Sequence, residues 1–125
     1  MIFGIGTDII ETARIEKAIK KTSSFPDKVF TEAEQEYCET QKAGKYQSYA
    51  ARYAAKEAFF KALGTGYRNG MSFKEIEVRN DALGKPEILV YGKVQSFIKK
   101  NKINRIHLSL SHLKETALAF VVLEK

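Results

Sequence analysis

The stretch from Lys45 to Leu63, KYQSYAARYAAKEAFFKAL, contains neither glycine nor proline and is followed directly by Gly64. The apolar residues that recur within it at helical spacing are Tyr46, Tyr49, Ala50, Tyr53 and Ala54. This spacing predicts a long buried helix over 45–63. Gly64 is expected to end the helix as a C′ glycine.

The segments before this helix indicate a strand followed by shorter helices. The apolar run 2–5 ends at Gly6, Thr7 and Asp8, which indicates a buried strand that delivers a carboxylate at its end. Apolar and basic residues are interleaved over 11–21, as in an amphipathic helix with a basic outer face. After a break at 23–26, Thr31 and Glu34 have the spacing of a capping box, so a helix should run from about residue 32 toward residue 41.

The segments after the long helix change to the periodicity of strands. Apolar residues at 73–78 and 88–90 flank a turn at 80–86, and a short helix is expected around 94–98. Alternation over 106–111 and an apolar run over 117–123 predict a second hairpin. We therefore expect an α+β fold, in which the long buried helix packs on a mainly antiparallel sheet, as a single domain over 1–125.

Composition limits the classes of function. The chain has 125 residues, of which 44% are hydrophobic, enough for one compact core. Its 21 Lys and Arg against 15 Asp and Glu give a net charge of +6, which favours anionic partners. The single cysteine, Cys38, excludes an internal disulfide framework and suits a reducing cytosol. The start, MIFGIGTDII, has no basic region and carries Asp8 inside its apolar stretch, so we expect neither a signal peptide nor a membrane anchor.

The most informative polar residues lie on the long helix and at the end of the first strand. Glu57 and Lys61 have i, i+4 spacing, which can mean no more than an intrahelical ion pair worth about 0.2–0.5 kcal/mol. Together, however, Asp8 and Glu57 supply two carboxylates, the oxygen ligands that Mg²⁺ prefers. Lys61 beside them would neutralise phosphate. Gly64 and Gly66 would let a phosphate or ribose approach the backbone closely.

A second polar set lies on the expected penultimate strand. Period-two alternation places His107, Ser109 and Ser111 on one face, with His112 at the end of the strand. A hydrogen-bonded or surface histidine is an equally good interpretation of either imidazole. A serine–histidine hydrolase is disfavoured because the chain has no Gly-x-Ser-x-Gly motif.

Four segments carry a family resemblance: GIGTDIIETARI at 4–15, ARYAAKEAFFKALGTG at 51–66, NDALGKP at 80–86 and HLSLSH at 107–112. In this order and spacing they resemble the holo-acyl-carrier-protein synthases, the short 4′-phosphopantetheinyl transferases. The resemblance implies transfer of phosphopantetheine from coenzyme A to a serine of an apo acyl carrier protein, with release of adenosine 3′,5′-bisphosphate. It also implies a homotrimer that binds coenzyme A at subunit interfaces.

Carried over residue by residue, the resemblance makes Asp8 and Glu57 the Mg²⁺ ligands and Lys61 the lysine next to the pyrophosphate. His107 would approach the nucleotide end, an approach that a neighbouring subunit could make. Gly64 and Gly66 would contact the cofactor through their backbone. Either Glu57 or a metal-bound water could accept the serine proton, and the sequence leaves both open.

The resemblance offers an explanation of the net positive charge. Acyl carrier proteins are strongly acidic, and complementary charge speeds the encounter of enzyme and carrier. The candidate docking residues on the helix 11–21 are Arg14, Lys17, Lys20 and Lys21, with Arg14 matching a carrier contact of the family. A merely solubilising helix face is the alternative. Size and resemblance favour the carrier of fatty-acid biosynthesis.

Two other classes of function fit the sequence less well. A small RNA-binding module would be basic and aromatic, but Tyr46, Tyr49 and Tyr53 have helical rather than strand spacing. A scaffold with a vestigial site would need a replaced ligand, yet Asp8 and Glu57 are both present. We therefore expect neither nucleic-acid nor membrane binding.

Overall fold

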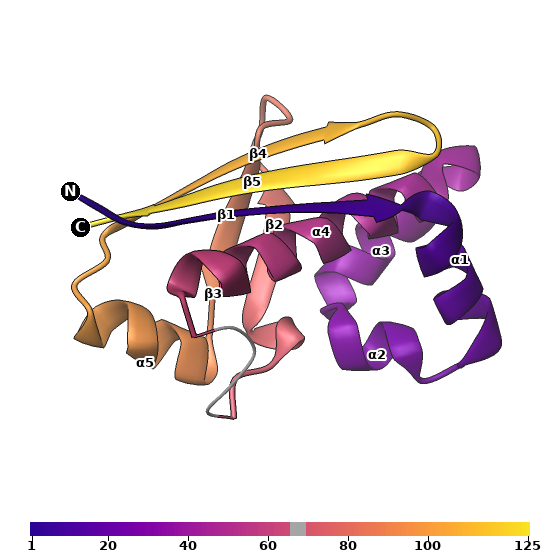
Figure 1. Ribbon diagram of the computed structural model, residues 1–125. Coiled ribbons are helices and arrows are strands. Elements are labelled where there is room, and N and C mark those ends of the chain that lie inside the picture. The colour runs from indigo at the N-terminus through magenta and orange to yellow at the C-terminus, as the bar shows by residue number, and fades with distance from the viewer. Residues whose placement is uncertain (66–69) are drawn as a thin grey trace.

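The computed structural model describes residues 1–65 and 70–125 (Figure 1). The elements are, in chain order, β1 (Ile2–Glu11), α1 (Thr12–Lys21), α2 (Phe25–Val29), α3 (Glu32–Thr40), α4 (Lys45–Leu63), β2 (Ile76–Asn80), β3 (Pro86–Val90), α5 (Gly92–Lys100), β4 (Arg105–His112) and β5 (Thr116–Glu124). Short 3-10 helices lie at Lys42–Gly44 and Phe73–Glu75. The expected α+β class and the bounds of the long helix are confirmed.

Two antiparallel sheets enclose helix α4. One sheet has the strand order β1-β5-β4, and the other is the hairpin β2-β3. In Figure 1 the three-stranded sheet lies along one side of α4, the hairpin crosses behind it, and α5 and α1 lie at its opposite ends. Both chain termini lie side by side at the α5 end. Within the described residues, no helix has the length and apolar character needed to cross a membrane.

The packing of α4 on β1 depends on two glycines. A Cβ placed on Gly4 would lie 1.9 Å from the Ala62 carbonyl oxygen, and one placed on Gly6 would lie 1.9 Å from that of Ala58. The helix backbone therefore rests directly on the strand backbone, which only glycine permits. This close contact fixes how far Asp8 of β1 lies from the helix.

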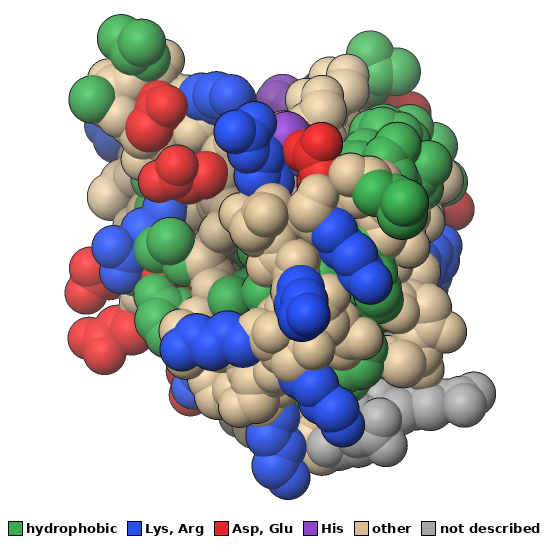
Figure 2. All heavy atoms as spheres, turned by 90° about the vertical axis from the view of Figure 1, so that its left-hand side faces the viewer, with side chains coloured by type: hydrophobic (Ala, Val, Ile, Leu, Met, Phe, Trp, Pro, Cys, Tyr) green, Lys and Arg blue, Asp and Glu red, His purple; other side chains and the backbone are tan. Residues whose placement is uncertain are grey.

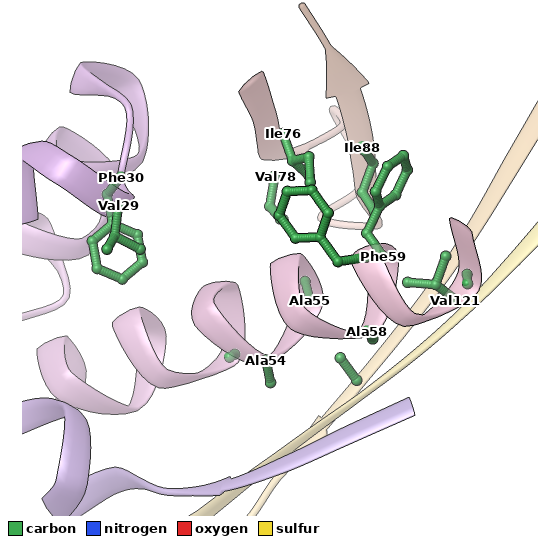
Figure 3. Packing of buried hydrophobic residues seen from close by; sticks show 14 of the residues in the cluster. Val29, Phe30, Ala54, Ala55, Ala58, Phe59, Ile76, Val78, Ile88 and Val121 are labelled. Atoms are coloured by element: carbon green, nitrogen blue, oxygen red, sulfur yellow. The ribbon is translucent and has the colours of Figure 1, made fainter. Parts of the chain in front are cut away.

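The opposite side of α4 carries the larger apolar side chains. Phe59 lies on the side of α4 that faces Ile76 and Ile88 of the β2-β3 hairpin, whereas Ala54 and Ala58 lie toward the strands of the three-stranded sheet (Figure 3). Alanine permits close approach on one side, and phenylalanine fills the wider space on the other. As expected, α4 is buried over most of its length and ends at Gly64, whose φ of 81° is left-handed.

A buried ion pair ties α4 to its neighbours. Lys56 Nζ lies 2.8 Å from Glu34 Oε1 of α3, and both side chains are fully buried. The same ammonium donates to the carbonyl oxygens of Phe73, at 2.9 Å, and Ile76. Glu34 also completes the predicted capping box by accepting from the Thr31 amide at 2.9 Å. These bonds satisfy a buried charge that would otherwise be costly, and they fix the rotation of α4 about its axis.

Three expectations at the level of elements were wrong. Strand β1 does not end at Asp8 but continues to Glu11, because its pairing with β5 runs on to Thr116. Nor is the strand buried throughout, since one of its faces points away from α4. Helix α2 begins at Phe25, within the expected break at 23–26, and its first turn accepts Pro26 because the missing N–H is not needed there. Finally, Phe73 belongs to a 3-10 helix rather than to a strand.

Candidate active site

Asp8 and Lys61 meet where β1 crosses α4. Lys61 Nζ lies 3.1 Å from Asp8 Oδ1 and donates to the Thr7 carbonyl oxygen at 3.0 Å. The Asp8 side chain is 17% exposed and that of Lys61 is 55% exposed, so the pair opens to solvent on the side of the lysine. Residues that are 53 positions apart in the chain therefore form one charged centre at the edge of the core.

Glu57 lies one turn before Lys61 on α4, but the two do not form the intrahelical ion pair that i, i+4 spacing permits. Among the ion pairs of residues 1–65 and 70–125, Lys61 contacts Asp8 and none involves Glu57. The simple interpretation of Glu57 and Lys61 as a helix-stabilising pair is therefore wrong. Glu57 remains a half-buried carboxylate available to a ligand.

Glu57 and Asp8 both lie close enough to Tyr53 to raise the pKa of its hydroxyl. Burial is the largest contribution that raises the pKa of Tyr53, to about 12, followed by the charge of Glu57 and a hydrogen bond to it. The charge of Asp8 acts in the same direction, and that of Arg14 opposes it. The tyrosine ring is held in place by stacking on Phe73, with 5.8 Å between centroids. From the sequence, Tyr53 is expected to lie close to the face of Glu57 and Lys61, but its contact with Glu57 is not predicted.

The centre has the donor set of a hard divalent cation. Asp8 and Glu57 supply carboxylate oxygens, and the described residues contain no group of three His, Cys, Asp or Glu side chains arranged to hold a metal. Mg²⁺ commonly takes one or two carboxylates and completes its shell with water and substrate phosphate. The ammonium of Lys61 already places positive charge against Asp8. The residues present therefore fit Mg²⁺.

His107 lies apart from this centre within one chain. In the sheet, His107 pairs with Val122 of β5, which pairs with Ile5 of β1, so these three side chains point to one face. Asp8 lies three positions after Ile5 on β1 and therefore points to the opposite face. His107 Nε2 is 2.9 Å from Glu124 Oε1, and this hydrogen bond lowers the pKa of the glutamate. The predicted placement of His107, Ser109 and Ser111 on one strand face is confirmed, and all three are exposed.

Gly64 and Gly66 both follow α4, and only Gly64 is among the described residues. Gly64 adopts a left-handed backbone, and a Cβ there would meet nothing within 4 Å, so the backbone is open to an approaching group. Gly66 lies outside the described residues. The structure accounts for Gly64 as a helix stop, and its role in cofactor contact stays a prediction.

A cavity of about 330 Å³ lies on the far side of α4 from Asp8, between α3, the hairpin and the end of β4. Its most distinctive residue is Arg52, which is 4% exposed. The guanidinium carbon lies 4.2 Å from the centre of the Tyr37 ring, and Nη1 donates to Ser48 Oγ at 3.3 Å. Its Nε is buried without a hydrogen-bond partner.

Arg52 is not among the residues whose role is predicted from the sequence. A charged residue between alanines on a buried helix was the available signal. A buried, incompletely paired guanidinium that lines a cavity is suited to an anionic ligand.

The candidate docking residues of α1 are accessible. Arg14, Lys17 and Lys21 are exposed, whereas Lys20 is paired with Glu16 at 2.8 Å and lies over the Tyr46 ring. The helix begins and ends close to the predicted positions. Three of its four cations are therefore free for a partner, and Lys20 is held in a local ion pair.

Comparisons with known proteins agree on one family. The family model of the 4′-phosphopantetheinyl transferase superfamily matches residues 4–121. A holo-[acyl-carrier-protein] synthase of Ruminiclostridium cellulolyticum is 51% identical over 95% of this chain and 90% of its own. One from a Geobacter species, strain M21, is 47% identical over the full length of both.

Solved structures extend the likeness to the fold. The holo-[acyl-carrier-protein] synthase of Neisseria meningitidis superposes with a TM-score of 0.91 at 42% identity, covering 100% of both chains. The Bacillus anthracis enzyme, solved in complex with CoA (3′,5′-ADP), has a TM-score of 0.82 at 44% identity and covers 99% of this chain and 97% of its own. The chain therefore belongs to the 4′-phosphopantetheinyl transferase superfamily and is a transferase of the holo-acyl-carrier-protein synthase type.

Proposed function

We propose that this enzyme transfers 4′-phosphopantetheine from coenzyme A to a serine of an apo acyl carrier protein, in a reaction that depends on Mg²⁺ and releases adenosine 3′,5′-bisphosphate. The observation that carries the proposal is the Lys61–Asp8 pair at the contact of β1 with α4, with Glu57 near it and bonded to Tyr53 rather than to a cation. The names of its relatives, and the coenzyme A complex of the Bacillus anthracis enzyme, support the choice of substrates.

Asp8 and Glu57 would hold the cation, and Lys61 would lie beside the pyrophosphate. When bound, Mg²⁺ offsets the charge that develops on the phosphate oxygens. Lys61 adds a second positive charge without competing for the metal position, because its long side chain is more than half exposed and can follow the ligand. Either Glu57 or a water bound to the cation would accept the proton of the incoming serine hydroxyl. Gly64 and Gly66 would let the pantetheine phosphate approach the backbone.

The cavity lined by Arg52 is our candidate for the nucleotide half of coenzyme A. Its buried Nε lacks a partner, and a phosphate would supply one. Leu110 lines this cavity. Asp8 of β1 and Leu110 of β4 both pair with Ala119 of the central strand β5. They therefore lie two strand spacings apart, about 10 Å, with α4 packed over the strand between them. Because α4 packs on the sheet between the two places, one coenzyme A on a single chain would have to pass around the helix to contact both.

A trimer would resolve this separation by bringing the cavity of one subunit to the carboxylates of the next. Its interface would use the sheet face that points away from α4. That face exposes an apolar stripe of Ile5 (55% exposed), Ile9 (65%) and Phe120 (41%), an unusual feature for a monomer. His107 lies on the same face, level with Ile5, so a neighbouring subunit could bring it to the nucleotide.

The acyl carrier protein would dock on α1 through Arg14, Lys17 and Lys21. We propose the carrier of fatty-acid biosynthesis as the substrate and the cytosol as the location, in keeping with a single buried cysteine. Arg14 also acts electrostatically on Tyr53, so a carrier that contacts it would bring its serine close to Glu57.

Intact-mass spectrometry tests this function. Purified apo acyl carrier protein, coenzyme A and Mg²⁺ are incubated with the enzyme, with EDTA and with the double variant Asp8→Ala/Glu57→Ala. A gain of one phosphopantetheine that is absent from both controls is expected. No gain with a folded enzyme and several carriers would overturn the proposed reaction.

A further inference from the structure

The net charge of the chain is concentrated in one segment. Residues 88–114 contain six Lys and Arg and no Asp or Glu, whereas the rest of the chain holds fifteen of each sign. This segment, which covers α5 and β4, therefore carries six positive charges and no negative one, whereas α1 carries four cations and one acid. Such a one-signed surface attracts a partner of opposite charge over a distance of about 10 Å at moderate salt.

Five of these six cations, all except Lys114, belong together with Lys125 to a basic surface at the end of the molecule where the termini lie. We call it the α5 basic face, and its residues are Lys93, Lys99, Lys100, Lys102, Arg105 and Lys125. All six are exposed, and none takes part in an ion pair within residues 1–65 and 70–125. Figure 2 looks onto this end: blue side chains spread over the centre and lower part, and red ones lie toward the upper and left margins.

The acidic groups nearest to this face are already engaged. Glu75 accepts hydrogen bonds from the backbone amides of Ser72 and Lys93, at 3.0 and 2.9 Å. Glu124 is bonded to His107 and lies near Arg105, whose charge contributes to lowering the pKa of the glutamate. The six cations of the face outnumber these two carboxylates, so the face keeps a net positive charge for a partner.

An apolar slot lies between the lysines. Met71 and Phe97 line a cavity of about 240 Å³ together with Lys93, Ser96 and Lys100. Lys93, Phe97 and Lys100 have the spacing i, i+4, i+7, so they follow one side of α5. Phe97 is fixed by an edge contact with Phe3, with 6.4 Å between ring centroids. The slot is thus a preformed apolar depression with a cation at each end.

We infer that the α5 basic face is a docking surface for the acidic side of the acyl carrier protein, separate from α1. This inference rests on the proposed function. Two positive ends around an apolar slot fit a protein surface in which an apolar side chain is flanked by carboxylates. The surface adjoins the end of α4 that carries Lys61 and Gly64, so a carrier held there would stay next to the phosphate-binding end of the helix (Figure 1).

Other polyanions fit this face less well. Bases of a nucleic acid need exposed aromatic rings to stack on, but Phe97 is half-buried in the slot. Tyr91, the exposed ring before α5, is held against Glu77 by a hydrogen bond that its hydroxyl donates at 2.8 Å. Insertion into a lipid surface needs outward apolar residues on the helix, but Val94 and Ile98 of α5 are buried in the core.

The test is a binding measurement that does not require turnover. The Kd of purified apo acyl carrier protein is measured for the wild type and for Lys93→Glu/Lys100→Glu, at about 0.1 M and about 1 M NaCl. One substitution adds an acid near the start of α5 and the other near its end, so their effects on the helix dipole oppose each other. The matched control is Lys28→Glu/Lys114→Glu, which changes the net charge equally at exposed positions outside the face.

We expect the α5 pair to weaken carrier binding by about tenfold or more at the lower salt and by much less at the higher salt, since exposed charges are screened. The control pair should change the Kd less than about threefold. The Kd of coenzyme A and the melting temperature should stay at their wild-type values in both pairs.

A wild-type carrier Kd in the α5 pair would overturn the inference, as would equal losses in both pairs. Loss of binding to single-stranded RNA or to anionic vesicles, with carrier binding intact, would assign the face to those partners and also overturn it. The proposed function fails separately: it fails if the wild type binds the carrier through α5 but transfers nothing to it.

Discussion

The contact between β1 and α4 can be tested by one added methyl group, in the variant Gly6→Ala. The new Cβ would lie 1.9 Å from the Ala58 carbonyl oxygen and 2.7 Å from the Ala62 nitrogen. Both neighbours are helix backbone and cannot rotate away. Because ordinary contacts begin near 3.4 Å, strand and helix must separate by about 1.5 Å at this point.

Two consequences follow from this separation. Overpacking of this kind costs about 1–3 kcal/mol of the free energy of unfolding, which lowers the melting temperature by about 3–15 °C in a domain of this size. The Lys61–Asp8 distance, 3.1 Å, would also open beyond hydrogen-bonding range. Misplacement of a reacting centre by about 1 Å can reduce the rate by about 100-fold.

Thermal unfolding by circular dichroism and single-turnover transfer at saturating coenzyme A and Mg²⁺ measure the two effects. Gly44→Ala is the control for stability, because its nearest neighbour is a flexible Gln47 side chain at 3.9 Å and its φ is −89°. It should change the free energy of unfolding by less than about 1 kcal/mol. A Gly6→Ala variant with the wild-type melting temperature and rate would refute the close packing of α4 on β1.

Three further variants probe other parts of the structure. Lys56→Met should cost about 3–5 kcal/mol in the free energy of unfolding because it leaves Glu34 buried without its partner, and the added change Glu34→Gln should restore part of that loss in denaturant unfolding. Arg52→Lys should raise the Kd of coenzyme A by about tenfold or more in calorimetry, since an ammonium cannot reproduce the guanidinium fork, while unchanged affinity would remove Arg52 from the binding site. Phe120→Glu should convert a trimer to monomers in light scattering and reduce transfer with it, and a persisting trimer would contradict the proposed interface.

The long helix could be predicted well from sequence because its evidence is local. A run of 19 residues without glycine or proline, with apolar residues at helical spacing and Gly64 behind it, has few other solutions. The capping box at Thr31 and Glu34 is likewise local and is confirmed. By contrast, the end of β1 depends on pairing with β5, more than a hundred residues away, and no local pattern marks it.

The candidate site was predictable in its residues but only partly in its arrangement. Asp8, Glu57 and Lys61 were selected by chemistry and resemblance, yet the partner of Lys61 is set by how α4 lies on β1. The role of Arg52 depends on a cavity formed by four separate elements, which periodicity cannot reveal. His107 was correctly placed on an exposed strand face, but its contact with Glu124 follows from strand register alone.

The central claim is that Asp8 and Glu57 together hold the cation on which transfer depends. Single-turnover transfer to apo acyl carrier protein, measured as Mg²⁺ is titrated, tests it in the wild type, Asp8→Asn and Glu57→Gln, which remove charge and retain shape. The account predicts that each variant shifts the Mg²⁺ midpoint upward by about tenfold or more and lowers the rate at saturation. A wild-type midpoint and rate in both folded variants would contradict it.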